Sequence, residues 1–203
     1  MFKLIAVTNR NLCRDNFLER IEAIVQTDVS ALILREKELR QEEYELLARE
    51  VLSICEQYNT ECMFHFFADS LFIKNHGCIH IPLWILKENK DIRRNYSKIG
   101  VSIHSLKEAT EALALGADYL VAGHIFETNC KKGLKPRGID FLREVCENVD
   151  IPVYAIGGIT EKNIRQIKDA GASGGCIMSE FMKRNDLNDF GKKIRNELNL
   201  SEK

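Results

Sequence analysis

The chain has 203 residues, of which 45% are hydrophobic and 29% are charged, and its formal net charge is -1 at pH 7. This composition suits one globular domain with a sizeable core, and the small net charge gives no general reason to expect nucleic acid or an acidic membrane as a partner. Seven scattered cysteines without a Cys-x-x-Cys pair, no signal peptide and no apolar run near the roughly 20 residues of a membrane span predict a cytoplasmic protein with free thiols.

Short apolar runs recur along the chain, and longer segments with helical spacing separate them. The runs lack strict alternation of apolar and polar residues, which is typical of strands that are buried on both faces. In chain order, these predicted strands cover residues 4–7, 31–34, 62–66, 78–81, 99–103, 119–122, 152–156 and 175–178.

The segments between the predicted strands carry apolar residues at helical spacing. The pattern is weakest after the third and fourth strands. Ser105 and Glu108 have the spacing of a capping box, and Gly116 stands where that helix should end. Thr160 is a candidate cap of a later helix, which Gly171 would end. The apolar stripes are Leu18, Ile21 and Val25; Leu47, Val51 and Ile54; Ile164 and Ile167; and Phe190, Ile194 and Leu198.

Eight alternations of strand and helix, with no linker or change of composition, predict one α/β domain over residues 1–203. We expect a small (β/α)8 TIM barrel, with a doubly wound open sheet as the alternative. A barrel places its active site at the C-terminal ends of the strands. Polar residues follow most of the predicted strands: Thr8 and Asn9, Arg35 to Lys37, His104, His124 to Lys132, Gly157 and Gly158, and Ser179.

Gly157 and Gly158 leave the seventh predicted strand and lead into a helix. Paired glycines let backbone N–H groups approach a phosphate, and barrels often build a phosphate site from the loops after strands seven and eight. Ser179 supplies the eighth-strand half of such a site. The plainer interpretation is a tight turn.

Arg35, Glu36 and Lys37 directly follow the second predicted strand. The two cations can bind an anionic substrate, and Glu36 can orient them or take part in proton transfer. A surface run of ion pairs is the alternative explanation.

His124 follows the sixth predicted strand, and Thr128, Lys131 and Lys132 come soon after it. A neutral imidazole can accept and return a proton near neutral pH, so this loop is suited to acid–base chemistry on an anion. A histidine held by a backbone hydrogen bond is the structural alternative. His104 has a weaker claim, and we interpret His65, His76 and His80 as core or surface histidines because their spacing fits no metal site.

Taken together, these residues resemble the thiamine phosphate synthase superfamily, and the resemblance covers nearly the whole chain. It implies the (β/α)8 fold and a thiazole phosphate bound against the seventh and eighth strand loops. The matching stretches are residues 6–9 (Ala-Val-Thr-Asn), 34–37 (Leu-Arg-Glu-Lys), 99–102 (Ile-Gly-Val-Ser), 116–119 (Gly-Ala-Asp-Tyr), 155–159 (Ala-Ile-Gly-Gly-Ile) and 178–179 (Met-Ser).

The superfamily includes synthases, which join a pyrimidine pyrophosphate to a thiazole phosphate and need magnesium. The resemblance implies two magnesium-binding carboxylates, after the third and the fourth strand. Phe66 and Ile85 stand at those positions here, and neither has the oxygen ligands that magnesium requires.

The TenI-type branch of the superfamily isomerises a carboxylated thiazole phosphate to its aromatic tautomer without a metal. Synthases read Gly-Pro-x-Phe-x-Thr-x-Thr-Lys after the sixth strand, whereas this branch reads Gly-His-x-Phe-Glu-Thr-x-Cys-Lys-Lys-Gly. Residues 123–133 read Gly-His-Ile-Phe-Glu-Thr-Asn-Cys-Lys-Lys-Gly and match the second pattern. The resemblance therefore implies that His124 is the general acid and base.

We expect catalysis by His124 and Glu36, and substrate binding by Arg35, Lys37, Ser102, Thr128, Lys131, Lys132, Gly157, Gly158 and Ser179. No metal or other cofactor is expected, except magnesium if the protein is a synthase. The partner is a small thiazole phosphate, and a homodimer is a further possibility. Two alternatives to the tautomerase stay open: a magnesium-dependent synthase and a non-enzymatic regulator that binds thiamine-related phosphates.

Overall fold

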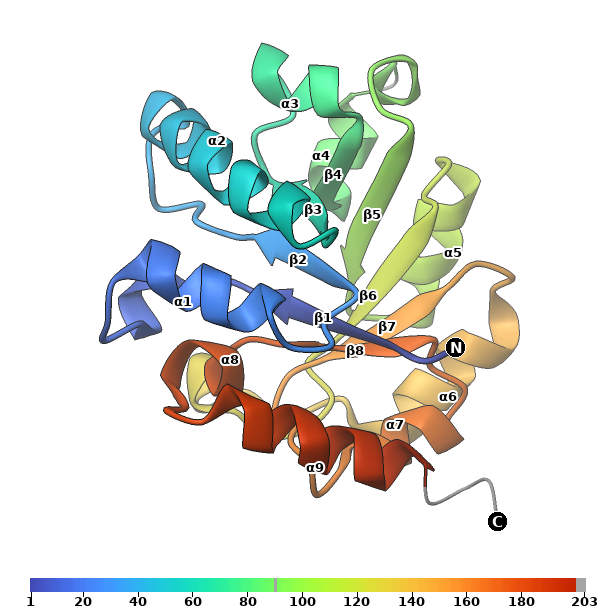
Figure 1. The fold of residues 1–203 in the computed structure, drawn as a ribbon. Coiled ribbons are helices and arrows are strands. Elements are labelled where there is room, and N and C mark those ends of the chain that lie inside the picture. The colour runs from blue at the N-terminus through green and yellow to red at the C-terminus, as the bar shows by residue number, and fades with distance from the viewer. Residues whose placement is uncertain (90, 200–203) are drawn as a thin grey trace.

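The computed structural model describes residues 1–89 and 91–199, so residues 90 and 200–203 of the predicted domain lie outside it. Eight strands of the described chain form a closed parallel barrel, and helices surround it (Figure 1). This arrangement confirms the predicted (β/α)8 barrel. The strands are β1 Lys3–Val7, β2 Ala31–Leu34, β3 Glu61–His65, β4 Cys78–Pro82, β5 Lys98–Ile103, β6 Tyr119–Gly123, β7 Val153–Ile156 and β8 Gly174–Ile177.

The pairing of the first strand closes the barrel. Ile5 of β1 lies opposite Ala31 of β2 on one side and opposite Cys176 of β8 on the other. Because β1 has a partner on both sides, the sheet has no open edge, and the doubly wound alternative is wrong. Every predicted strand overlaps an observed one, with ends that differ by at most one residue.

The helices cover the outside of the barrel with their apolar stripes. Ile21 and Val25, for example, are buried under the first helix, and Phe190 and Ile194 under the last. The helices after β3 and β4, where the helical pattern is weakest, are short. The helices are α1 Phe17–Val25, α2 Gln41–Gln57, α3 Leu71–His76, α4 Leu83–Glu88, α5 Leu106–Ala114, α6 Gly138–Asn148, α7 Ile164–Asp169, α8 Ser179–Lys183 and α9 Leu187–Asn199, with 3-10 turns η1 Arg10–Leu12, η2 Ile92–Arg94 and η3 Asn129–Lys131.

One of the two predicted helix starts is correct. Ser105 caps α5, because its hydroxyl accepts a hydrogen bond from the backbone N–H of Glu108 at 3.1 Å. Thr160 does not cap α7, which begins after Asn163. The Asn163 side chain accepts from the backbone N–H of Thr160 at 2.8 Å and closes a turn that delays the helix.

The barrel interior is a separate small core below the mouth. Tyr119 fills much of it, and a Cβ at Gly100 would lie 1.9 Å from the Tyr119 ring, so glycine is required there. This packed interior supports the residues at the strand ends. The buried interior residues are Ile5, Val7, Ala31, Ile33, Met63, Tyr119, Val121, Tyr154 and Cys176.

Candidate active site

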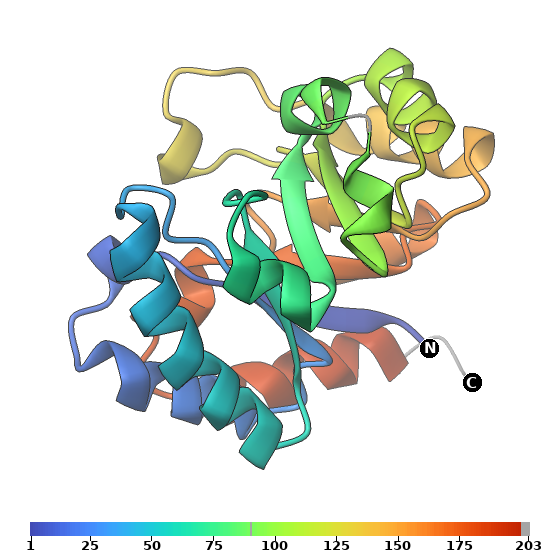
Figure 2. The same ribbon diagram turned by 90° about the horizontal axis from the view of Figure 1, so that it is seen from above.

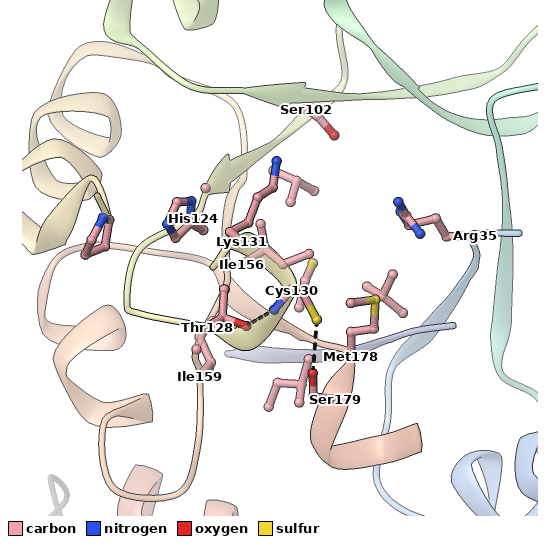
Figure 3. A pocket seen from close by; sticks show the side chains of 18 of the residues that line it. Arg35, Ser102, His124, Thr128, Cys130, Lys131, Ile156, Ile159, Met178 and Ser179 are labelled. Atoms are coloured by element: carbon pink, nitrogen blue, oxygen red, sulfur yellow. Dashed lines mark hydrogen bonds between the residues drawn. The ribbon is translucent and has the colours of Figure 1, made fainter. Parts of the chain in front are cut away.

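A cavity of about 1320 Å³ lies at the C-terminal ends of the strands. Arg35 and His124 lie on opposite sides of it (Figure 3), and the connection that follows β6 projects beyond the strand ends (Figure 2). The structure brings every proposed substrate-binding residue to this cavity, together with His124. These residues are Arg35, Lys37, Ser102, His124, Thr128, Lys131, Lys132, Gly157, Gly158 and Ser179.

Gly157 and Gly158 are held tightly against the loop that follows β6. Their φ angles are +101° and +66°, a region that favours glycine. A Cβ at Gly157 would lie 2.4 Å from the Cβ of His124, and one at Gly158 would lie 2.3 Å from the carbonyl oxygen of Glu127. The two glycines therefore let the loops after β6 and β7 touch, which sets the position of His124 in the cavity.

The loop after β6 also contacts the beginning of α8. The Thr128 hydroxyl accepts a hydrogen bond from the backbone N–H of Cys130 at 3.4 Å, and the Cys130 thiol lies 3.5 Å from the Ser179 hydroxyl (Figure 3). Lys183 also lines the cavity, although it lies at the end of α8 and not directly after a strand. Lys131, Lys132 and Lys183 outnumber the acidic residues Glu127 and Glu180 here, so this side of the cavity is basic.

His124 is buried but remains part of the cavity wall. The residue is 8% exposed, and its Nε2 lies 3.4 Å from the carbonyl oxygen of Leu134. A carbonyl can only accept, so this contact favours the tautomer that carries its proton on Nε2 and leaves Nδ1 as a base. The backbone N–H of Arg137 donates to the His124 carbonyl at 2.9 Å and holds the loop in place.

Glu36 does not line the cavity, whereas a residue that exchanges a proton with the substrate has to reach it. It is fully buried, and its carboxylate accepts hydrogen bonds from the Thr8 hydroxyl at 2.6 Å and from the backbone N–H of Arg10 at 3.0 Å. Burial raises the pKa of Glu36, against the lowering effect of the bonds from Thr8 and Arg10. Its place in the structure is that of a link between two loops.

Two histidines of the cavity wall, His65 and His80, are buried, which agrees with their interpretation as core residues. His65 and His80 lie opposite each other in the β3–β4 register, and both line the cavity. Nε2 of His80 lies 2.8 Å from the Ser102 hydroxyl, and Nδ1 lies 3.2 Å from the Tyr119 hydroxyl. Burial lowers the pKa of His80 to about 3. His65 ends β3 and His80 lies in the middle of β4, so only the register of the two strands brings their side chains together.

His104 also lines the cavity, at the edge where α5 begins. Its Nδ1 lies 3.3 Å from Glu108, whose carboxylate also accepts the His104 backbone N–H at 2.6 Å. Burial lowers the pKa of His104, although the Glu108 carboxylate acts in the opposite direction. These contacts make His104 part of the α5 helix start, as its weaker claim in the sequence suggested.

The residues at the expected magnesium positions do not fit that ion. Phe66 lines the cavity with a phenyl ring, and Ile85 is 5% exposed and packs into the core. Asp69 is the first acidic residue that follows Phe66 in the sequence. Its side chain is 87% exposed and forms an ion pair with Lys74 at 3.8 Å. Across residues 1–89 and 91–199, no three or more histidine, cysteine or acidic side chains gather as a metal site would require.

Fold and site together define a class: a small TIM barrel with a basic cavity, suited to an anionic small molecule, at its strand ends. Residues 4–181 match the family described as thiamine monophosphate synthase. A putative thiamine-phosphate synthase 2 from Aquifex aeolicus is 34% identical over 182 residues, which cover 89% of this chain and 97% of the relative. The thiamine-phosphate synthase of Clostridium tetani is 30% identical over 187 residues, covering 91% and 90%.

A solved structure agrees with this relationship. The thiamine phosphate pyrophosphorylase from Pyrococcus furiosus superposes with a TM-score of 0.84 at 28% identity, and the alignment covers 97% of this chain and 95% of that one. The chain therefore belongs to the thiamine monophosphate synthase family, whose named relatives are enzymes of thiamine biosynthesis. In the described part of the chain, no helix combines the length and the apolar character needed to cross a bilayer.

Proposed function

We propose that the protein is a metal-independent tautomerase that converts a carboxylated thiazole phosphate to its aromatic isomer. The observation that carries the proposal is the chemistry of the cavity wall. His124 places an imidazole in that wall. At the two positions where a synthase needs carboxylates, Phe66 places a phenyl ring in the wall and Ile85 is a buried alkyl side chain of the core. A proton shift needs the imidazole and does not need the magnesium-binding carboxylates.

The cavity supplies a place for each part of such a substrate. The phosphate is held against Gly157, Gly158 and the Ser179 hydroxyl, with Lys132 compensating its charge. The ring then lies toward His124, which forms the wall between these loops.

In the proposed step, the free ring nitrogen of His124 accepts a proton from a carbon of the substrate ring system. The imidazolium returns a proton to another carbon of the same conjugated system. No atom enters or leaves, and the aromatic product supplies the driving force. Glu36 takes no proton in this step, because it does not reach the cavity; instead, it positions Arg35.

A magnesium-dependent synthase is the second candidate, and the names of the relatives favour it. The Aquifex aeolicus and Clostridium tetani proteins both carry that activity in their names. The side chains at Phe66 and Ile85 weigh against it here, since expulsion of pyrophosphate needs a cation that these residues cannot hold.

The test is NMR of the carboxythiazole phosphate mixed with chelator-treated protein, beside the His124→Ala variant. We expect conversion by the parent and a loss of roughly 10²–10⁴-fold in the variant. His76→Ala is the matched control, because His76 is exposed and lies outside the cavity. A folded parent protein that leaves the tautomer unchanged contradicts the proposal.

We also propose a cytoplasmic location, supported by the free thiols of all seven cysteines in the described structure. A homodimer stays a prediction, which sedimentation of the purified protein measures directly.

A further inference from the structure

One arginine outside the cavity, Arg184, connects the two segments that form the proposed phosphate position. It follows α8 directly and does not line the cavity in the described structure. Its Nη2 donates to both carboxylate oxygens of Glu161, at 3.0 and 2.8 Å, and its Nε donates to the carboxylate of Glu180. Glu161 belongs to the loop after β7 and Glu180 belongs to α8. One guanidinium therefore joins the segments that follow β7 and β8.

Arg184 is itself held in place from two further sides. The central carbon of its guanidinium lies 4.4 Å from the centre of the Phe190 ring on α9, which is a cation–π contact. Its carbonyl oxygen accepts a hydrogen bond at 2.6 Å from Nη1 of Arg20, a buried residue of α1. The Arg184 side chain is only 29% exposed. Because water and salt screen such partly buried charges less than surface charges, these ion pairs are stronger than ordinary surface pairs.

The contact with Glu161 reaches the paired glycines through one turn. The side-chain amide of Asn163 donates to the carbonyl oxygen of Gly158 at 2.8 Å, and its oxygen accepts the backbone N–H of Thr160 at 2.8 Å. Glu161 therefore lies inside a closed turn that begins at Gly158. By holding Glu161, Arg184 holds this turn and the backbone of Gly158 at the proposed phosphate position.

The contact with Glu180 has an electrostatic consequence for the same position. Glu180 directly follows Ser179, whose hydroxyl is the other proposed phosphate contact, and both residues line the cavity. A carboxylate beside an anion repels it unless a cation compensates the charge. The ion pair with Arg184 supplies that compensation, so the lysines on this side of the cavity can attract the phosphate.

We propose that Arg184 is a positioning residue for the substrate phosphate. It ties the loop after β7 to α8, and it compensates the charge of Glu180 beside the anion. The inference rests on the tautomerase proposal for the position of the phosphate, at Gly157, Gly158 and Ser179. Because Arg184 lies outside the cavity, it acts on substrate binding and not on the proton shift at His124.

The test measures the dissociation constant of inorganic phosphate by isothermal titration calorimetry at low ionic strength. Arg184→Gln is expected to raise this constant roughly 3- to 30-fold, the effect of one uncompensated charge at an intermediate distance. Arg184→Lys keeps the charge but lacks the planar fork that pairs with both carboxylates, so we expect a smaller increase of about two- to five-fold. Adding Glu180→Gln to Arg184→Gln removes the uncompensated charge and should recover part of the affinity.

The matched control is Arg165→Gln, because Arg165 forms an ion pair with Asp169 at 3.7 Å on α7 and does not line the cavity. Urea unfolding of each variant separates a loss of stability from a loss of binding. With the carboxythiazole phosphate as substrate, Arg184→Gln should raise KM by a factor similar to that for phosphate and leave kcat within about three-fold. A merely structural role would lower the stability without this division between KM and kcat.

Three results overturn the proposal: no phosphate binding by the folded parent, unchanged phosphate affinity in the Arg184 variants, or an equal loss of affinity in Arg165→Gln. If Arg184→Gln does not fold, Arg184→Lys decides, and parental affinity in that variant contradicts the proposal. Turnover separates this proposal from the tautomerase. A parent that converts the tautomer, with KM unchanged in the Arg184 variants, contradicts the role of Arg184 alone. A parent that binds phosphate and responds to Arg184→Gln, but leaves the tautomer unchanged, contradicts the tautomerase alone.

Discussion

The hydroxyl of Thr8 donates a 2.6 Å hydrogen bond to the carboxylate of Glu36 and accepts the backbone N–H of Arg35 at 2.9 Å. Glu36 in turn accepts the backbone N–H of Arg10. One buried carboxylate thus joins the loops after β1 and β2 and fixes the start of the segment that carries Arg35 and Lys37 into the cavity. Its effect on the substrate is indirect.

Replacing Glu36 by alanine leaves the buried Thr8 hydroxyl and the Arg10 N–H without their acceptor. We expect a loss of about 1–3 kcal/mol in the free energy of unfolding, a raised KM from the displaced Arg35, and a kcat within a few-fold of the parent. Glu36→Gln retains an acceptor oxygen and rescues most of both losses. Steady-state kinetics and urea unfolding measure these effects, with Glu50→Gln as an exposed control on α2. A large fall in kcat with KM unchanged contradicts a positioning role.

The raised pKa of Glu36 also predicts a pH effect with a definite sign. A carboxyl group whose folded pKa exceeds its unfolded value favours folding most when it is protonated, below the unfolded value of 4.5. That contribution is lost as the pH rises through the folded pKa. The unfolding free energy of Glu36→Gln should therefore increase relative to that of the parent as the pH rises through this window. Unfolding curves measured across the window check the sign, and a gain on acidification would contradict it.

The lowered pKa of His80 predicts that the unfolding free energy changes with pH in the opposite direction. Its pKa of about 3 lies far below the ordinary value of 6.5, so between these values the unfolded chain takes up a proton that the folded chain does not. The contribution of neutral His80 is present above 6.5 and is lost as the pH falls toward 3. We expect His80→Gln to flatten the acid side of the stability profile.

Urea unfolding at neutral pH and at a pH inside that window measures the effect. His76→Gln is the control because His76 is exposed. An acid limb that is as steep in His80→Gln as in the parent shows that another group causes it.

Gly157→Ala tests how closely the β7 loop fixes His124. The added methyl group would meet the His124 Cβ at 2.4 Å and also suffer the positive φ, whereas at Gly116 the φ is +88° with no heavy atom within 4 Å. Gly116→Ala should therefore cost only about 1–2 kcal/mol of unfolding free energy, for the left-handed backbone. We expect Gly157→Ala to cost more and to reduce kcat as well. Equal costs with full activity in both variants contradict the role of this contact.

The barrel could be predicted closely because its information is local. Eight buried apolar runs and the apolar stripes between them predict the alternation of strand and helix, and crossovers between parallel strands have one hand. Only the pairing of β1 with β8 distinguishes the barrel from the open sheet. The start of α7 could not be predicted, because both Thr160 and Asn163 are good capping residues, and only the turn between them decides which one is used.

The sequence predicts correctly which residues reach the cavity when this depends on their position at the end of a strand. It does not predict this when it depends on the direction in which a side chain points. His124, the residues from Glu127 to Lys132 and the paired glycines reach the cavity, as strand-end positions should. Glu36 occupies an equally good position, but its side chain turns to Thr8. His65 and His80 are buried, as their interpretation as core histidines predicts, and only the barrel register shows that they also meet at the cavity wall.

The most direct measurement compares two reactions of the same preparation, with and without magnesium. One is tautomerisation of the carboxythiazole phosphate, and the other is formation of thiamine phosphate from the pyrimidine pyrophosphate and the thiazole phosphate. We predict tautomerisation at the same rate in chelator and in magnesium, a rate lower by roughly 10²–10⁴-fold in His124→Ala, and no coupling in either condition. Magnesium-dependent coupling without tautomerisation would contradict the account and make the protein a synthase.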